Sequence, residues 1–223
     1  MSSYLIWYNI ILLTPFQKLG TTVFLNTHAP GWNKWYPYMN MRNYAVLEKL
    51  LEGYDVHVFC GHPHFFQNVD VNEHLYQHNV GAACGALWWG NVNRCGAPNG
   101  YMIVDVDNAD VKWLYKATGR SANYQMHVYK KGEFRTQKDY IVANIWDYDN
   151  KCSVEWSQDG VNMGKMEQFS DQDEEYVSID RPSKLPKCYT AHLFRLKPEN
   201  GVRKVEITFK NHFGEKYKES IDL

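Results

Sequence analysis

The chain has 223 residues, a formal net charge of −1 and an apolar content of 44%, which is ordinary for one large globular domain or two small ones. Its 24 basic and 25 acidic residues form no long basic run, so the charge pattern of a protein that binds a nucleic-acid backbone is missing. Aromatic residues make up 15% of the chain. We expect them mainly in β-rich cores, with a surface that stacks against sugars or other ligands as the alternative.

The five cysteines are odd in number and form no CxxC pair. This argues against a disulfide framework and against a cysteine-based zinc site. Cys84 lies in a run of small residues, and we predict that it is a packed thiol.

The N-terminal stretch from Tyr4 to Leu13 is apolar apart from Asn9. It is too short to span a bilayer and lacks the basic start and cleavage site of a signal peptide. We predict a buried helix or strand here, and no transmembrane segment.

A strand–helix–strand unit follows. Thr21 to Asn26 and Val56 to Cys60 are β-branched, apolar runs that predict buried strands. Between them, Met41 to Tyr54 has apolar residues at helical spacing. Such units normally join parallel strands, whose carboxyl ends lie at the same edge of the sheet.

Histidines follow both strands. His28 comes after the first, and the motif Gly61-His62-Pro63-His64 comes after the second. Pro63 favours an extended backbone at His62, and residues two apart in extended backbone point to the same side. Because ligands bind outside the carboxyl ends of such strands, we predict that His28 and His62 meet there, in a position that suits a metal ion. The alternative is a pair of surface histidines in a loop.

The rest of the chain reads mainly as strands. Gln67 to Asn72 and His78 to Ala83 predict short strands, and Tyr101 to Asp107 with Asp110 to Lys116 predicts a hairpin. From about Met126 onward, alternating apolar residues between turn signals predict a β-sandwich of immunoglobulin-like type.

For the other polar residues we predict structural or solvated roles. His57 alternates with apolar residues within a strand and is predicted to be structural. We expect His74 and His78 to be solvated. The acidic run from Asp171 to Glu175 predicts a solvated loop, with a metal-binding loop as the alternative.

Several of these motifs, in this order, resemble the calcineurin-like metallophosphoesterases, in particular the C-terminal part of a bacterial branch in which a β-domain follows the catalytic core. The resemblance rests on Thr27-His28-Ala29-Pro30, Gly61-His62-Pro63-His64, Gly81-Ala82-Ala83-Cys84-Gly85, Cys95-Gly96-Ala97-Pro98-Asn99-Gly100-Tyr101 and Trp113-Leu114-Tyr115-Lys116. It implies an α+β fold: the second half of a metallophosphoesterase α/β sandwich core in residues 1–124, then an immunoglobulin-like β-sandwich in residues 125–223. The resembling branch is often exported to the periplasm.

The resemblance also implies a chemistry. In that family two divalent metal ions hold a phosphate and activate a water that attacks phosphorus. His28 and His62 would bind one ion and His64 the other. Neutral imidazole suits Zn, Mn, Fe or Ni, with partial occupancy expected here, and the substrate would be a phosphorylated small molecule or another phosphoester.

The sequence departs from the family in one respect. The Asp-x-His, Gly-Asp-x-x-Asp and Gly-Asn-His-Asp/Glu motifs that precede His28 in the family are absent, and Met1 to Gly20 contain no Asp, Glu or His. Three histidines are too few ligands for two metal ions, and two cations without an anionic bridge repel each other. We therefore expect an incomplete two-metal site with weak or no activity from this chain alone.

Three alternatives remain open at this point. The chain is a subunit whose partner supplies the missing ligands, a non-enzymatic binding or scaffold module that uses the Trp88-Trp89 loop, or a truncated product without function. The loss of upstream strands also predicts that Thr22 to Leu25 forms a sheet edge, which a partner chain, a second copy or the Tyr4 to Leu13 segment would cover.

Overall fold

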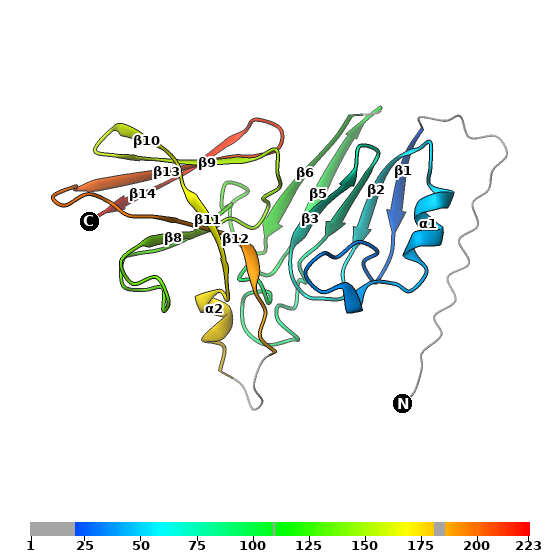
Figure 1. Ribbon diagram of the computed structural model, residues 1–223, viewed down its shortest axis with the longest axis horizontal. Coiled ribbons are helices and arrows are strands. Elements are labelled where there is room, and N and C mark those ends of the chain that lie inside the picture. The colour runs from blue at the N-terminus through cyan, green and yellow to red at the C-terminus, as the bar shows by residue number, and fades with distance from the viewer. Residues whose placement is uncertain (1–20, 109, 181–185) are drawn as a thin grey trace.

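The computed structural model describes residues 21–108, 110–180 and 186–223; the predicted apolar segment from Tyr4 to Leu13 lies outside them. These residues form mostly β-strands with few helices. Figure 1 shows a sheet with a helix beside it, a separate group of strands from the C-terminal half, and a long hairpin between the two. No helix among the described residues is long and apolar enough to cross a lipid bilayer.

The N-terminal half contains a four-stranded sheet in the order β1-β2-β4-β3 and a hairpin of β5 with β6. Its elements are β1 (Thr22–Asn26), the 3-10 helix η1 (Pro37–Met39), α1 (Tyr44–Leu50), β2 (Asp55–Cys60), β3 (Gln67–Asn72), β4 (Leu75–Asn79), β5 (Gly100–Asp107) and β6 (Asp110–Ala117). Strands β1, β2 and β4 run parallel, and β3 pairs antiparallel with β4. The predicted strand–helix–strand unit and the predicted hairpin are confirmed.

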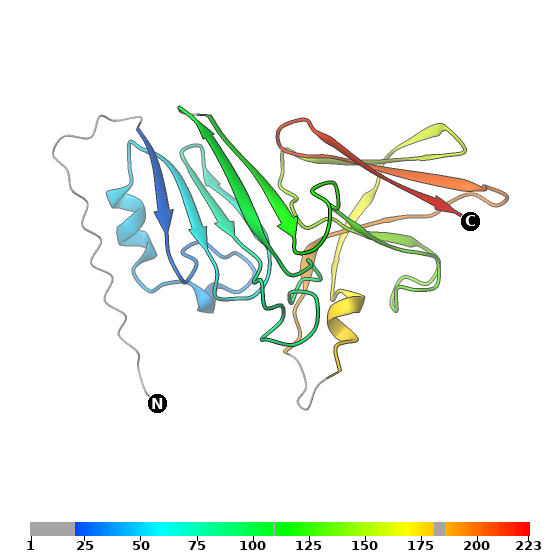
Figure 2. The ribbon, with the colours of Figure 1, turned by 180° about the vertical axis from the view of Figure 1, so that it is seen from behind.

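Alternation along β2 gives the sheet two different faces. Val56 and Val58 pack in one cluster with Leu47 of α1. The ring of His57 points the other way and lies 5.8 Å from the ring of Trp113 on β6. The sheet therefore lies between α1 and the β5–β6 hairpin, as Figure 2 shows from behind.

Strand β1 lies at one edge of this sheet and, within the described residues, pairs with β2 alone. This confirms the predicted edge. Strand β4 (Leu75–Asn79) overlaps the predicted His78 to Ala83 strand only at its end, because it begins and ends several residues earlier than predicted. The chain leaves the sheet near Gly81, where a Cβ would stand only 2.5 Å from the Tyr115 hydroxyl.

The C-terminal half contains two four-stranded sheets, ordered β10-β9-β13-β14 and β11-β12-β8-β7. Its elements are β7 (His127–Tyr129), β8 (Ile141–Asn144), β9 (Ser153–Gln158), β10 (Val161–Lys165), β11 (Glu167–Asp171), α2 (Glu174–Val177), β12 (Thr190–Leu196), β13 (Lys204–Lys210) and β14 (Lys216–Asp222). One core cluster joins Ile141 and Phe194 of one sheet to Ile207 and Ile221 of the other. A β-rich C-terminal region is thus confirmed, whereas its immunoglobulin-like type stays a prediction.

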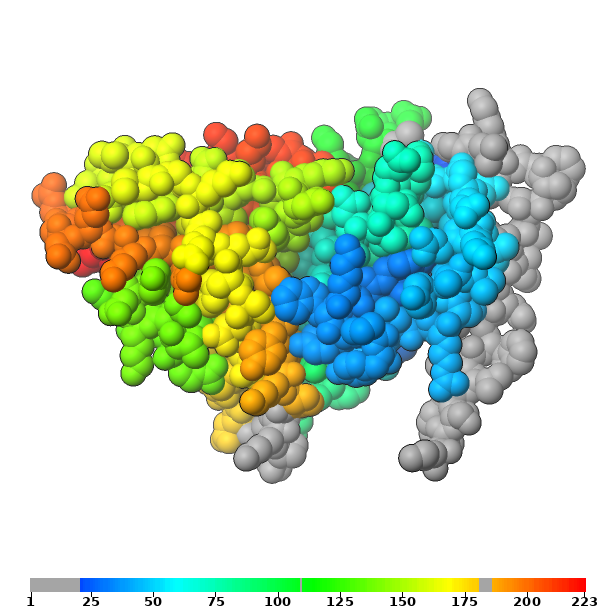
Figure 3. All heavy atoms as spheres, in the orientation of Figure 1, coloured from blue at the N-terminus to red at the C-terminus, as the bar shows by residue number. Residues whose placement is uncertain are grey.

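The two halves are joined by contacts along a seam. Asp147 accepts hydrogen bonds from Asn68 Nδ2 at 2.8 Å and from the Tyr115 backbone N–H at 3.2 Å. Tyr189 N–H donates to the Tyr36 hydroxyl at 2.8 Å. In Figure 3 the blue surface of the segment around η1 meets the yellow and orange surface of the C-terminal half along this seam.

Candidate functional site

The structure places His28 and His62 together at the carboxyl ends of β1 and β2. The loops that follow these parallel strands are tied by Thr27 N–H to Phe59 O at 2.9 Å and by Gly61 N–H to His28 O at 3.1 Å. As a result His28 Nε2 lies 3.0 Å from His62 Nδ1. Burial, followed by the neighbouring charges of His28 and His64, lowers the pKa of His62, which favours the neutral ring that a metal ligand requires.

The backbone around this pair differs from the predicted extended form. His62 has φ 74° and His64 has φ 54°, so both adopt the left-handed conformation, which is rare for residues other than glycine. Arg94 holds this turn, because it donates its backbone N–H to His64 O at 2.8 Å and Nη1 to Pro63 O at 3.3 Å. Such backbone strain clusters at functional sites.

His64 does not join the pair in a three-histidine cluster. Its Nδ1 lies 2.7 Å from Gly85 O and 3.2 Å from the Leu87 backbone N, so the backbone engages Nδ1 and Nε2 is the ring nitrogen that remains for a ligand. This is the arrangement that metal-binding histidines commonly have. The Trp88 ring packs edge-on against His64 at 5.3 Å, although Trp88 is 75% exposed.

The donor set fits part of a metal site. Two metal–nitrogen bonds of about 2.0–2.1 Å at a tetrahedral angle would hold the two nitrogens about 3.4 Å apart, close to the 3.0 Å between His28 Nε2 and His62 Nδ1. Within residues 21–108, 110–180 and 186–223, however, no group of three or more His, Cys, Asp or Glu side chains is placed to hold an ion. The pair supplies two ligands, and the described residues do not fit a complete two-metal centre.

Two further histidines, His74 and His78, were predicted to be solvated, and the structure confirms this for the exposed one only. His74 is exposed and bonds Asp55 at 2.8 Å, so its predicted solvated role is confirmed. The prediction for His78 is wrong: it is fully buried, lies 3.1 Å from His57 Nδ1 and 3.1 Å from Asn68 Oδ1, and burial holds its pKa well below the usual value. His78 lies on β4, inside the sheet.

Two further predictions are wrong. Cys84 is exposed, because only the glycines of its small-residue run are buried, and its Sγ lies 4.0 Å from His64 Nδ1. The run from Asp171 to Glu175 was predicted to be a solvated loop, but its central residue, Asp173, is fully buried. Asp173 caps α2 through Tyr176 N–H at 3.2 Å and accepts from the Tyr129 hydroxyl at 2.8 Å. Burial raises its pKa to about 6.

Comparison with known families gave one match. The family model described as the C terminal of calcineurin-like phosphoesterase matches residues 77–217, which is more than half of the chain. The matched region runs from β4 to β14 and contains the hairpin and both C-terminal sheets, whereas the three histidines precede it. Searches of curated proteins and of solved structures gave no match. The chain belongs to the family of C-terminal regions of calcineurin-like phosphoesterases.

Proposed function

We propose that this chain is the C-terminal portion of a metal-dependent phosphoesterase and that it carries only part of the metal centre. The observation that carries the proposal is the contact between His28 and His62 at the ends of two parallel strands, next to a region that belongs to this family. In this proposal residues 1–124 form the partial α/β core and residues 125–223 form an immunoglobulin-like β-sandwich.

His28 and His62 would bind one divalent transition metal ion, and His64 would bind a second through Nε2. Such ions act as Lewis acids on phosphoryl oxygens and lower the pKa of bound water. The chain's own contribution is to hold two neutral imidazoles at a fixed separation. Because no carboxylate among the described residues joins them, the remaining ligands must come from another chain or segment, and the chain alone should hydrolyse phosphoesters weakly or not at all.

Metal binding tests this proposal. The purified chain should bind about one Co²⁺ or Zn²⁺ ion, at the His28–His62 pair, because His64 alone gives the second ion a single protein ligand. His28→Ala or His62→Ala should weaken binding more than the roughly 10–100-fold that loss of an outer-shell partner costs. His74→Ala is the matched control, because His74 is exposed and bonds Asp55 instead, and it should bind metal normally. Equilibrium dialysis and Co²⁺ absorption spectra measure both.

Two results would contradict the proposal in different ways. Absence of metal from the wild-type chain, or equal binding by all variants, would remove the metal site. Vigorous metal-dependent hydrolysis of p-nitrophenyl phosphate by the purified chain would show that the centre is complete.

A binding module is the second candidate function. Trp88 and Trp89 are exposed, at 75% and 44%, and Trp88 borders His64. If this loop binds a glycan, Trp88→Ala and Trp89→Ala should abolish binding on a glycan array. Tyr38→Ala, an exposed aromatic elsewhere, should leave it intact. Absence of any bound glycan would remove this candidate.

A further inference from the structure

Arg94 carries a buried charge in the segment between β4 and β5, where only 4% of the residue is exposed. Removing a guanidinium from water has a cost that is recovered only when a carboxylate pairs with it in good geometry. In the part of the chain that the structure describes, no carboxylate forms an ion pair with Arg94, and its Nε has no hydrogen-bond partner. Because natural chains accept such local costs mainly at functional sites, the burial of this charge points to a function for Arg94.

The donors of Arg94 bind the turn that carries the candidate metal ligands. Its backbone N–H donates to His64 O at 2.8 Å, and its Nη1 donates to Pro63 O at 3.3 Å. Both carbonyls belong to the turn in which His62 and His64 adopt left-handed backbone. Metal–ligand distances tolerate changes of only about 0.2 Å, so a group that fixes this turn also fixes the affinity of the site for a metal ion.

The same guanidinium packs against residues on the seam between the two halves. Its Cζ lies 5.7 Å from the centroid of the Tyr36 ring, which is within the range of a cation–π contact. It also interacts with the side chains of Tyr176, on α2, and Cys188. Arg94 therefore lies between the metal-binding turn and the C-terminal half of the chain.

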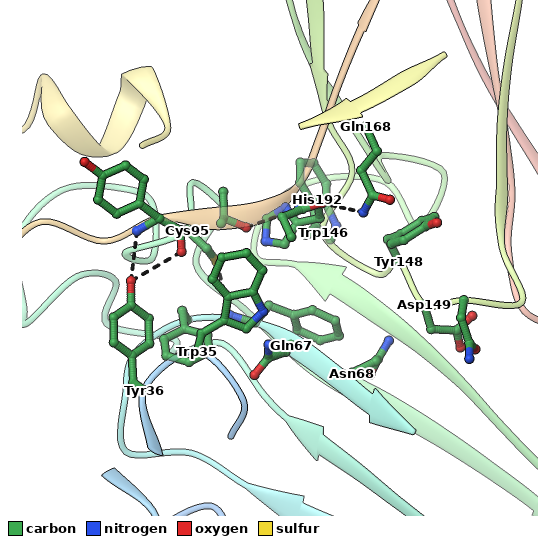
Figure 4. A pocket seen from close by; sticks show the side chains of 16 residues that line it. Trp35, Tyr36, Gln67, Asn68, Cys95, Trp146, Tyr148, Asp149, Gln168 and His192 are labelled. Carbon is green, nitrogen blue, oxygen red and sulfur yellow. Dashed lines mark hydrogen bonds between the residues drawn. The ribbon is translucent and has the colours of Figure 1, made fainter. Parts of the chain in front are cut away.

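Tyr36 joins Arg94 to the C-terminal half through its hydroxyl. This hydroxyl accepts a hydrogen bond from Tyr189 N–H at 2.8 Å and donates one to Tyr189 O at 3.3 Å; Figure 4 shows both bonds as dashed lines from Tyr36. The Tyr36 side chain also lines a cavity of about 180 Å³, so packing does not fix it on that side and the two hydrogen bonds matter more. A continuous series of contacts thus runs from Tyr189, which precedes β12, through Tyr36 and Arg94 to Pro63.

We propose that Arg94 is a positioning residue for the metal-binding turn and that it transmits to this turn how the C-terminal half is docked. The proposal rests on the proposed function, because it assigns Arg94 to the same metal site. It also gives the family-matched region a part in metal binding. Residues 77–217 contain Arg94 and Tyr189, although the three histidines precede them.

Titration of the full chain with Co²⁺ tests the proposal. Arg94→Met keeps most of the side-chain volume but removes the side-chain donors, and should weaken Co²⁺ binding by about 10–100-fold, as loss of an outer-shell partner does. Tyr36→Phe keeps the ring but removes the hydroxyl that bonds Tyr189, and should weaken binding by about two- to fivefold. The absorption spectrum of bound Co²⁺ should change in both variants, because the geometry of its ligands changes.

Tyr76→Phe removes a second hydroxyl from the seam and serves as the control. The Tyr76 hydroxyl donates across the seam to Asp149 Oδ2 at 2.6 Å, and this contact lies outside the series from Tyr189 to Pro63. Its loss should leave the affinity and the spectrum of Co²⁺ unchanged. Equal weakening by Tyr36→Phe and Tyr76→Phe would mean that any loosening of the seam has the same effect, and would overturn the proposal.

A double variant tests whether the two residues act in series. In the Arg94→Met background, Tyr36→Phe should cause no further loss of affinity, because its effect reaches the turn through Arg94. Losses that multiply would show that the two residues act independently and would contradict the proposal.

Nuclear magnetic resonance of the metal-free chain separates this proposal from the metal site itself. The ring nitrogen signals of His62 and His64 should shift in Arg94→Met and in Tyr36→Phe, and should stay in place in Tyr76→Phe. Shifted signals in a chain that binds no metal would refute the proposed function and support the positioning role. Signals and Co²⁺ affinities that neither Arg94→Met nor Tyr36→Phe changes would overturn the positioning role.

Discussion

Replacing Gly96 with alanine should lower the free energy of unfolding by about 4 kcal/mol or more, whereas the same replacement at Gly119 should cost only about 1 kcal/mol. Both glycines have left-handed backbone, with φ 80° and φ 71°, so the conformational penalty is alike. A Cβ on Gly96 would overlap the Asp173 carboxylate, while a Cβ on Gly119 would meet nothing within 4 Å.

The larger cost at Gly96 follows because Asp173 has nowhere to move. Its carboxylate accepts from the Tyr129 hydroxyl, Asn144 Nδ2 and Tyr176 N–H, and it is fully buried. Displacing it would leave these donors unpaired, at about 1–3 kcal/mol each. It would also release Asn144, which orients His192.

Urea unfolding followed by circular dichroism measures both variants against the wild type. Equal midpoint shifts for Gly96→Ala and Gly119→Ala would mean that the backbone penalty alone matters and that the Asp173 contact is dispensable.

Acidification should destabilise the wild type relative to His192→Gln. Burial lowers the pKa of His192 to about 3, so between that value and its ordinary pKa of about 6.5 the unfolded chain binds a proton that the folded chain does not. Stability therefore falls as the pH falls through this window, by about 1.4 kcal/mol per pH unit. Between about pH 6.5 and about pH 4.5 the difference should reach roughly 2–3 kcal/mol.

The variant is needed because other groups act in the opposite direction. Burial raises the pKa values of Asp147 and Asp173 to about 6, so the folded chain binds extra protons there and gains stability on acidification. These groups are present in both proteins and cancel in the comparison. Urea midpoints at several pH values give the two curves. Parallel curves would mean that His192 does not titrate on unfolding.

Local pattern was enough to predict much of the fold. Periodicity identified β1, α1, β2 and the β5–β6 hairpin, because one buried face imposes a period of two on a strand and 3.6 on a helix. The turn at Asp159 and Gly160 also follows from local chemistry: both have positive φ and they join β9 to β10. The meeting of His28 and His62 followed from the parallel direction of their strands.

The errors concern polar residues whose burial depends on distant partners. His78 and Asp173 carry the local signs of solvated residues, yet each is hydrogen-bonded by a residue on another element: His78 by Asn68 on the paired strand β3, and Asp173 by Asn144 on β8. The left-handed backbone at His62 precedes Pro63, whose carbonyl accepts a hydrogen bond from the distant Arg94. The local sequence shows which hydrogen-bond donors and acceptors a residue carries, but it does not show which residues will be their partners.

The sequence by itself thus determined the strand–helix–strand unit with its parallel strands, the β5–β6 hairpin and the two histidines at the strand ends, because these depend on residues near one another in the chain. Only the tertiary structure decided that His64 faces Gly85 and that a cavity opens where Tyr36, Trp146 and His192 come together. The physical reason is that a cavity and an unpaired polar atom depend on how distant segments pack together. Packing between distant segments does not change the period of apolar residues within either segment, so the sequence pattern does not reveal it.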